Sequence, residues 1–380
     1  MNTSDLIPGH ATRGATEEYS RTLGSGLAEG HYSDFLNEHL KLSSLGIGTF
    51  PGAASDEVDD AYATVVHDAA RAGINVFDTA AHYRYGRSAV ALGLGLARAF
   101  ADGVRREQVF VVGKGGFLVT PGGPPQDFDA FFDANVVARG LGSRADLAGM
   151  HLISPQHLDA QIDAVRAATG LATLDAFLLD QPEVHFAAIG KEMTNRKIAQ
   201  VFATFERARA DGRIRSYGIS TFDGLRAETD ALAFQSLTSM IGLAEKAAQE
   251  VQGSSAHGLR VVQMPFNQAM TEGFTRFSQA TGKGNIASSV QAAHQLRVYM
   301  MASHTLGKGM LAQQSAEAVE RALADLPNAA QRAMQFNRST PGIGTSLVGV
   351  SNPAHLADLL AVARRPPMPR AEYLKLYERA

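Results

Sequence analysis

The chain of 380 residues is 45% hydrophobic and 19% charged, and its formal net charge is −3. This length allows one large α/β barrel or two smaller domains around a sizeable core. The charges form no long runs of one sign, which argues against nucleic acid or an anionic membrane as a partner. The absence of Cys excludes disulfides, thiolate metal sites and Cys nucleophiles.

No apolar run reaches the roughly 18 to 20 residues that span a bilayer. Residues 1–20, MNTSDLIPGHATRGATEEYS, lack the apolar core of a signal peptide. We therefore expect a cytoplasmic protein, a monomer or a homo-oligomer, that acts on a small molecule. We expect no metal, since the 12 His include no HExxH motif.

Short β-rich runs alternate with helical stretches after a polar leader, which we take as an N-terminal extension over residues 1–43. This alternation is typical of parallel βα units, and eight of them predict a TIM (β/α)8 barrel over residues 44–366. A doubly wound sheet is the alternative, and residues 367–380 form a C-terminal tail. The strands are expected in LSSLGIGTF, NVFDTA, VFVVGKGGF, LDAFLLDQ, RIRSYGISTF, RVVQMPFN, RVYMMASH and TSLVGVS.

Glycines near the start of this pattern do not form a dinucleotide-binding loop. In GIGTFPG, residues 46–52, Pro51 stands where the third glycine of GxGxxG would fall, so the Rossmann fingerprint is absent. Gly93 and Gly95 lie inside a predicted helix, where we expect them to permit close packing.

An acid, a phenol and an ammonium follow or end two of the predicted strands. Asp78 and Tyr83 come directly after the second strand, and Lys114 ends the third, although strands rarely carry a buried Lys without a partner. Taken singly, Asp78 fits a helix cap, Tyr83 a packing residue and Lys114 a snorkelling side chain. Together they suggest a carbonyl reductase in which the ammonium favours the phenolate and eases proton transfer.

A long connection over residues 118–153 follows the strand that carries Lys114. Loops at that end of the strands build TIM-barrel active sites. Its aromatic residues Phe128, Phe131 and Phe132 therefore either form a substrate lid or hold the insertion together as a small core.

The acid, phenol and lysine constellation resembles the aldo-keto reductase family, and matching segments extend from Leu45 to about Ala363. These include LGIGTF, YGISTF, VVQMPFN, MASHTLGKGML and LVGVSNPAHLADLL. The resemblance implies an NADP cofactor, with NAD as a possibility because His355 replaces the usual basic residue near the 2′-phosphate. It places the cofactor contacts at Gly48, Thr49, Phe50, Ser220, Thr221, Gln263, Ser303, Leu306, Gly307, Ser351, His355 and Asp358.

One departure from the family falls in the active site. In LLDQPE, Asp180 stands at the usual catalytic His and Gln181 at the neighbouring Asn. An ionised Asp180 would repel a developing oxyanion, whereas a protonated one could donate a hydrogen bond to it. A family branch that reduces steroid double bonds has Glu there, which suggests an enone as one possible substrate. His82, His185 and His304 are alternative donors.

These residues predict a reductase of an aldehyde, ketone or enone that uses NADPH, with Tyr83 as proton donor, Lys114 and Asp78 supporting it and Asp180 modifying the oxygen site. One alternative on the same fold is a redox-neutral elimination or cyclisation, with Tyr83 and Asp180 as acid and base. Another is a nicotinamide-binding subunit without catalysis.

Overall fold

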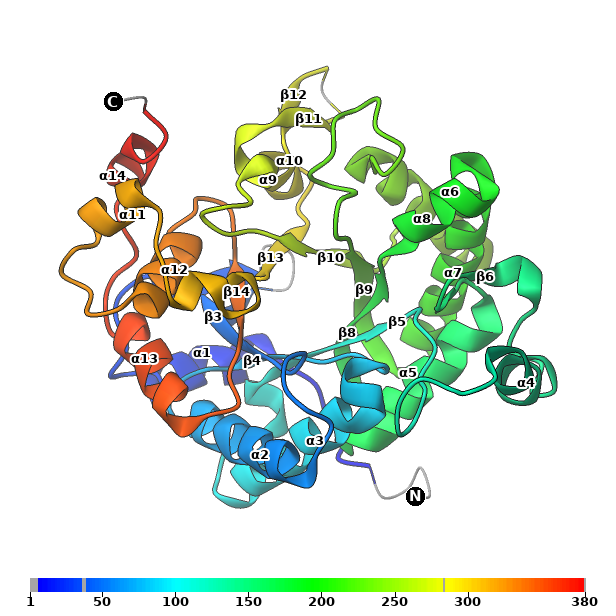
Figure 1. Cartoon of the computed structure of the whole chain (residues 1–380), viewed down its shortest axis with the longest axis horizontal. Coiled ribbons are helices and arrows are strands. Elements are labelled where there is room, and N and C mark those ends of the chain that lie inside the picture. Colours follow the sequence, from blue (N-terminus) through cyan, green and yellow to red (C-terminus); the bar gives the residue numbers. More distant parts are fainter. Residues whose placement is uncertain (1–5, 36–38, 283, 379–380) are drawn as a thin grey trace.

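A closed parallel barrel forms the centre of the computed structural model, which describes residues 6–35, 39–282 and 284–378. Its strands follow the chain order around the ring, and β14 pairs with β3 to close it (Figure 1). The expected TIM barrel is confirmed and the doubly wound sheet is wrong, because this sheet has no edge. The barrel strands are β3 (Leu45–Gly48), β4 (Val76–Asp78), β5 (Phe110–Gly115), β8 (Leu174–Asp180), β9 (Ile214–Ser220), β10 (Leu259–Pro265), β13 (Tyr299–Ser303) and β14 (Thr345–Gly349).

The expected N-terminal extension and C-terminal tail are described only in part, because residues 1–5, 36–38 and 379–380 lie outside the described residues.

Apolar residues on both faces of each strand explain why the barrel is buried on both sides. In β8, Ala176 and Leu178 belong to the cluster inside the barrel, whereas Phe177 and Leu179 pack outward against the helices. Successive side chains of a strand point to opposite faces, so one apolar run supplies both cores.

Helices surround the barrel (Figure 1). Several begin at a Ser whose hydroxyl accepts from the first turn, as Ser55 does from the Val58 amide. A Cβ on Gly93 would lie 2.7 Å from the Thr169 carbonyl oxygen, which confirms that this glycine permits close packing. The helices are α1 (Arg13–Arg21), α2 (Asp56–Arg71), α3 (Arg87–Ala101), α4 (Phe128–Phe132), α5 (Pro155–Thr169), α6 (Phe186–Ile189), α7 (Lys191–Ala210), α8 (Leu237–Gln252), α9 (Glu272–Thr275), α10 (Ser289–Gln295), α11 (Glu317–Ala322), α12 (Ala329–Arg338), α13 (Pro353–Ala363) and α14 (Arg370–Lys375).

A hairpin of β1 (Tyr32–Phe35) and β2 (Leu40–Ser43) closes the amino end of the barrel. The Phe35 ring lies 5.5 Å from the ring of Phe110 and 5.0 Å from that of Tyr299, measured between centroids. Since Phe110 and Tyr299 begin β5 and β13, Phe35 seals the barrel at the end opposite the carboxyl termini of its strands.

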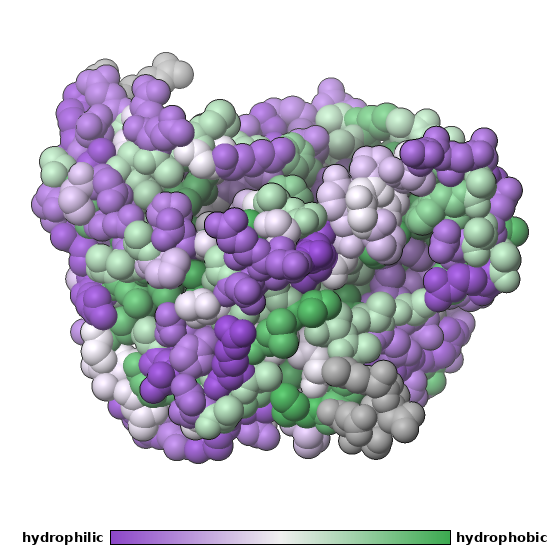
Figure 2. Space-filling view, turned by 60° about the horizontal axis from the view of Figure 1, so that its bottom comes forward, coloured by the Kyte–Doolittle hydropathy of each residue, from purple (hydrophilic) through white to green (hydrophobic). Residues whose placement is uncertain are grey.

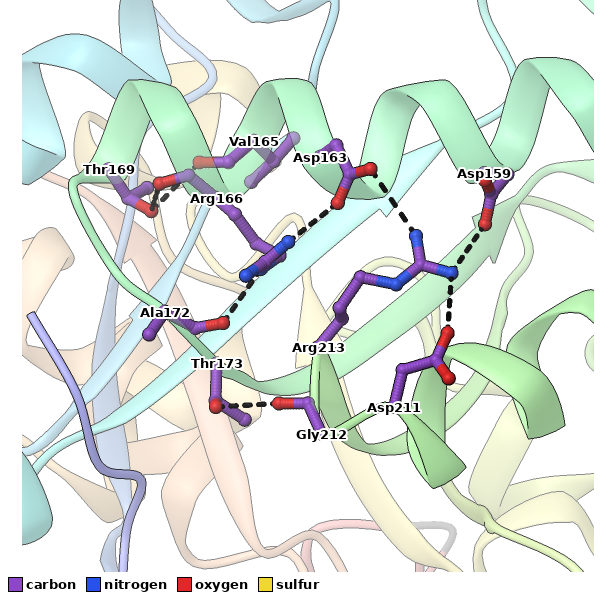
Figure 3. A network of polar contacts seen from close by, with 10 residues as sticks. All are labelled: Asp159, Asp163, Val165, Arg166, Thr169, Ala172, Thr173, Asp211, Gly212 and Arg213. Carbon is purple, nitrogen blue, oxygen red and sulfur yellow. Dashed lines mark hydrogen bonds and ion pairs between the residues drawn. The ribbon is translucent and has the colours of Figure 1, made fainter. Parts of the chain in front are cut away.

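A charged network braces the same end (Figure 3). The Arg213 guanidinium, directly before β9, donates to Asp159 at 2.8 Å and to Asp163 at 3.4 Å, both on α5. Arg166 donates to Asp163 at 2.6 Å, and the Thr173 hydroxyl donates to the Gly212 carbonyl at 2.7 Å. These contacts fix α5 and the starts of β8 and β9 relative to one another.

The insertion at 118–153 projects from the barrel at α4 (Figure 1) and contains the short hairpin of β6 (Leu147–Ala148) and β7 (His151–Leu152). Phe132 is fully buried with Leu118 and Leu152 in a small cluster, and Phe128 and Phe131 pack against it. The small-core interpretation of these aromatic residues is therefore confirmed. The substrate-lid interpretation is wrong, since none of them lines the large cavity described below.

A third hairpin, of β11 (Phe277–Ala280) and β12 (Ile286–Ser288), lies outside the barrel, and the C-terminal α14 packs on α12. The buried Tyr373 of α14 lies 5.3 Å from the Phe336 ring. The face drawn in Figure 2 carries small apolar patches bordered by polar side chains. No helix in the described part of the chain is long and apolar enough to cross a bilayer.

Candidate active site

A cavity of about 790 Å³ opens at the carboxyl ends of the barrel strands. One end is lined by Asp78 and Tyr83, and the other by His355 and Asp358 of α13. Strand register brings polar residues together at the first end, because Gly48 pairs with Asp78 and Ser220 pairs with both Asp180 and Gln263. Its volume lies within the range of about 300–1,000 Å³ that is typical of ligand pockets.

Asp78 and Lys114 form a buried ion pair at this end. The Lys114 side chain is fully buried, and its ammonium donates to Asp78 Oδ1. Gln263 Nε2 donates to the other carboxylate oxygen of Asp78 at 3.0 Å, and the Ser220 hydroxyl donates to Gln263 Oε1 at 3.2 Å. One continuous network thus joins the ends of β4, β5, β9 and β10.

Tyr83 lies beside this pair on the wall of the cavity. Its ring centroid is 4.9 Å from Lys114 Nζ and 5.0 Å from the Phe50 ring. Burial, followed by the negative charges of Asp180 and Asp78, raises the pKa of Tyr83 well above its ordinary value. The phenol of Tyr83 therefore keeps its proton at rest, because burial disfavours its charged form. The expectation that the Lys114 ammonium favours the phenolate during proton transfer stays a prediction.

An unusual backbone turn follows Tyr83. Arg84 and Tyr85 have φ angles of 49° and 59°, in the left-handed region, which non-glycine residues occupy at some energetic cost. The Arg84 side chain points away from the cavity, where it forms an ion pair with Asp59 at 2.6 Å and donates to the Ala53 carbonyl at 2.9 Å. These contacts tie the turn to the start of α2 and so position Tyr83.

Asp180, at the end of β8, is buried but does not line the cavity. Burial raises the pKa of Asp180 to about 6, while the Lys114 charge and hydrogen bonds with Ser220 and Gln181 oppose the rise. The next residue, Gln181, does line the cavity and has a left-handed φ of 45°. When it is ionised, the Asp180 carboxylate adds to the effect of burial in raising the pKa of Tyr83.

The three alternative imidazole donors lie in different places. His82 and His304 line the cavity, whereas His185 does not. His185 Nε2 lies 2.8 Å from Nδ1 of His151, whose Nε2 donates to the Asp180 carbonyl at 2.5 Å. His151 thus connects the insertion to the end of β8.

The expected cofactor residues divide into two groups. On the cavity wall are Gly48, Phe50, Gln263, Ser303, Leu306, His355 and Asp358. The others do not line the cavity, namely Thr49, Ser220, Thr221, Gly307 and Ser351. The Thr49 hydroxyl, for example, donates to the Asp78 carbonyl at 3.1 Å, so it supports the site instead of facing a ligand.

Other residues on the wall were not expected from the sequence. Lys308 is the one Lys or Arg that lines the cavity within the described ranges, and Asn328 donates to Asp358 at 3.0 Å at the far end. Phe222 lines the cavity as well, and its amide donates to the buried Glu183 at 2.6 Å. Lys308 could have been predicted, because it is a basic residue directly after the expected cofactor residues Leu306 and Gly307. The sequence around Asn328 gives no such indication.

No group of three or more His, Cys, Asp or Glu that could hold a metal ion occurs among residues 6–35, 39–282 and 284–378.

Comparisons with known proteins point in one direction. A family model described as "Aldo/keto reductase family" matches residues 44–377. A D-threo-aldose 1-dehydrogenase from Pseudomonas sp. is 29% identical over 184 residues, which are 48% of this chain and 49% of that protein. The chain thus matches this curated relative over about half of the relative's length.

Two solved structures share the fold at low identity. The first is an aldo/keto reductase from Klebsiella pneumoniae in complex with NADP and acetate, with a TM-score of 0.59, 15% identity and coverage of 91% of this chain and 94% of that chain. The second is an aldo-keto reductase from Bacillus halodurans in its holo form, with a TM-score of 0.57, 14% identity and coverage of 91% and 95%.

Proposed function

Since the chain belongs to the aldo/keto reductase family, as its motifs indicated, we propose that it reduces the carbonyl group of a small aldehyde, ketone or enone with NADPH. The observation that carries this proposal is the buried pair of Asp78 and Lys114 beside Tyr83, on one cavity at the carboxyl ends of the strands. The name of the aldose dehydrogenase relative states the reverse reaction, which is an oxidation.

Tyr83 is the proton donor in this proposal. Its raised pKa keeps the phenol protonated, so it releases its proton only to a strongly basic atom, such as the oxygen of a carbonyl that is being reduced. The ammonium of Lys114, 4.9 Å from the ring centroid, then stabilises the phenolate that is left. Asp78 and Gln263 hold the ammonium and its partner carboxylate in place.

The described residues fit a nicotinamide dinucleotide, which supplies hydride when bound. Gln263 and Ser220 form a pair of polar groups near Asp78, suited to the nicotinamide carboxamide. Lys308 offers a cation for the phosphates, and His355 and Asp358 lie at the far end of the cavity for the adenosine half. His355 is a weak partner for a 2′-phosphate at neutral pH, so we expect NADPH to be preferred over NADH only modestly.

Cofactor binding tests this proposal without requiring a known substrate. NADPH and NADH are titrated by fluorescence against the wild-type protein, Lys308→Met and Lys246→Met, an exposed Lys on α8. We expect Lys308→Met to weaken NADPH binding about tenfold, equivalent to about 1.4 kcal/mol, and Lys246→Met to leave it unchanged. If neither dinucleotide binds at millimolar concentration, the proposal fails, and the redox-neutral reaction becomes the better explanation of the site.

A further inference from the structure

The cavity wall beside Tyr83 carries an imidazole that the proton transfer above does not use. His82 lies directly before Tyr83, and its ring lines the cavity together with Asp78 and Gln263. Its ring centroid is 4.9 Å from that of Tyr83 and 4.8 Å from that of Phe117. Two aromatic neighbours therefore hold the imidazole next to the phenol that donates the proton.

The surroundings of His82 fix its protonation state. Burial, with a smaller effect of the Lys114 charge, lowers the pKa of His82 to about 3, so the ring is neutral near pH 7 and carries one N–H. Its Nδ1 is buried without a hydrogen-bond partner. A buried N–H without an acceptor is rare and costly, which places the proton on Nε2.

Asp180 does not supply a donor on this part of the wall. Its carboxyl is buried and is not among the groups that line the cavity. His304 lines the cavity too, but its ring packs against Phe222, with 5.4 Å between the ring centroids. Among the residues that line the cavity, His82 is thus the one whose imidazole ring contacts the ring of Tyr83.

We propose that His82 is a catalytic residue that donates a hydrogen bond from Nε2–H to the substrate carbonyl oxygen, next to the phenol of Tyr83. This role rests on the proposed reductase function. The carbonyl carbon accepts hydride from the bound cofactor to form the new C–H bond, and the released π electron pair takes the Tyr83 proton to form O–H. The Tyr83 phenolate regains a proton from water. His82 keeps its proton throughout and stabilises the charge that develops on oxygen.

Two substitutions separate this role from packing. His82→Phe keeps a ring against Phe117 and Tyr83 but removes both nitrogens, and His82→Gln restores an N–H at about the reach of Nε2. We expect kcat to fall about 100- to 1,000-fold in His82→Phe, as for loss of one oxyanion donor. His82→Gln should recover about tenfold of that loss. His294→Phe, at an exposed position on α10, is the matched control and should behave like wild type.

Three further measurements distinguish a donor from a structural ring. KM and the NADPH dissociation constant should stay within about threefold of wild type in both His82 variants. The reason is that the lost hydrogen bond strengthens in the transition state and contributes little to the binding of substrate or cofactor. Across para-substituted benzaldehydes, the loss in His82→Phe should be largest for electron-rich substrates, whose oxyanions need the donor most. The nitrogen-15 resonances of His82, assigned with His82→Gln, should show a protonated Nε2 and a bare Nδ1 in the wild-type protein.

Each outcome bears on one proposal. If the wild-type protein reduces carbonyls and His82→Phe retains its kcat within about threefold, the donor role is wrong and the reductase function stands. A parallel loss of NADPH affinity without rescue by His82→Gln also overturns the donor role, because it indicates packing. If the wild-type protein neither binds NADPH nor reduces any carbonyl, the reductase function itself has failed.

Discussion

Lys114 and Asp78 show at the residue scale how the site combines stability with chemistry. Both side chains are buried, and each depends on the other to compensate its charge. A buried pair of this kind contributes little net stability, but removal of one partner leaves the other charged and unpaired. Loss of either partner of the pair that supports Tyr83 should therefore also destabilise the fold.

Lys114→Met should lower the free energy of unfolding by about 3–5 kcal/mol, because it leaves Asp78 as an unpaired buried charge. The double variant Asp78→Asn with Lys114→Met should regain most of that stability, yet carbonyl reduction should stay lost in both. Urea unfolding and initial rates measure the two effects. If the double variant is as unstable as Lys114→Met, the unpaired charge of Asp78 does not explain the lost free energy of unfolding.

Asp180 makes stability depend on pH. Its raised pKa of about 6 means that, between about pH 4 and 6, the folded protein holds a proton that the unfolded chain has released. The free energy of unfolding should therefore fall as the pH rises through this window, by up to about 3 kcal/mol from this group.

Asp180→Asn removes this titration. Relative to wild type, the variant should gain about 1–3 kcal/mol in the free energy of unfolding between pH 4.5 and 7.5. Urea unfolding at both pH values measures the gain, and Asp230→Asn, at an exposed position, should show none. A difference between Asp180→Asn and wild type that does not change with pH would contradict the assigned state of Asp180.

At the scale of elements, the end of β5 is joined to the insertion by a close approach. Gly116 has a φ of 136°, and a Cβ at this position would lie 2.2 Å from His151 Nε2. That nitrogen donates to the Asp180 carbonyl. The glycine therefore lets the insertion reach the end of β8 beside the active site.

Gly116→Ala should displace His151 and loosen the insertion over residues 118–153. Gly122→Ala is the matched control, since its φ of 82° is also left-handed but its added Cβ would meet nothing within 4 Å. We expect hydrogen exchange in 118–153 to rise strongly in the first variant only, with the second paying about 1 kcal/mol for backbone strain. Equal exchange in both variants would mean that the contact with His151 does not hold the insertion.

The sequence predicted these elements unevenly, for physical reasons. Apolar runs located every barrel strand, and strand ends located Asp78 and Lys114, because parallel βα units place those ends together. The left-handed turn at Arg84 and Tyr85 could not be predicted, since it depends on contacts with α2. Three Phe in the insertion fitted a lid and a small core equally, because both require apolar residues.

Asp180 shows the same limit at the site. The sequence shows that an Asp stands at the end of a predicted strand. It does not show whether the carboxyl reaches the cavity, because that depends on side-chain packing at the end of β8. The sequence favoured a direct role for Asp180, whereas the cavity wall presents His82 and Gln181.

At the scale of the whole molecule, the two ends of the barrel have different tasks. Phe35 and the Arg213 network close and brace the amino end. The carboxyl end holds a cavity that extends from Tyr83 to α13. This cavity is long enough for both parts of the proposed function, with carbonyl reduction beside Tyr83 and the proposed cofactor along the rest of its length.

Transfer of deuterium from NADPH labelled at C4 of the nicotinamide tests the central claim most directly. Each C4 epimer is incubated with an aldehyde panel and the protein, and the alcohol products are analysed by mass spectrometry. With one epimer, the wild-type protein should place one deuterium on the former carbonyl carbon, and Tyr83→Phe should bind NADPH normally but form no labelled alcohol. Labelled alcohol from Tyr83→Phe at the wild-type rate, or substrate turnover without any transfer of deuterium, would contradict the assignment of this protein as a carbonyl reductase that uses Tyr83.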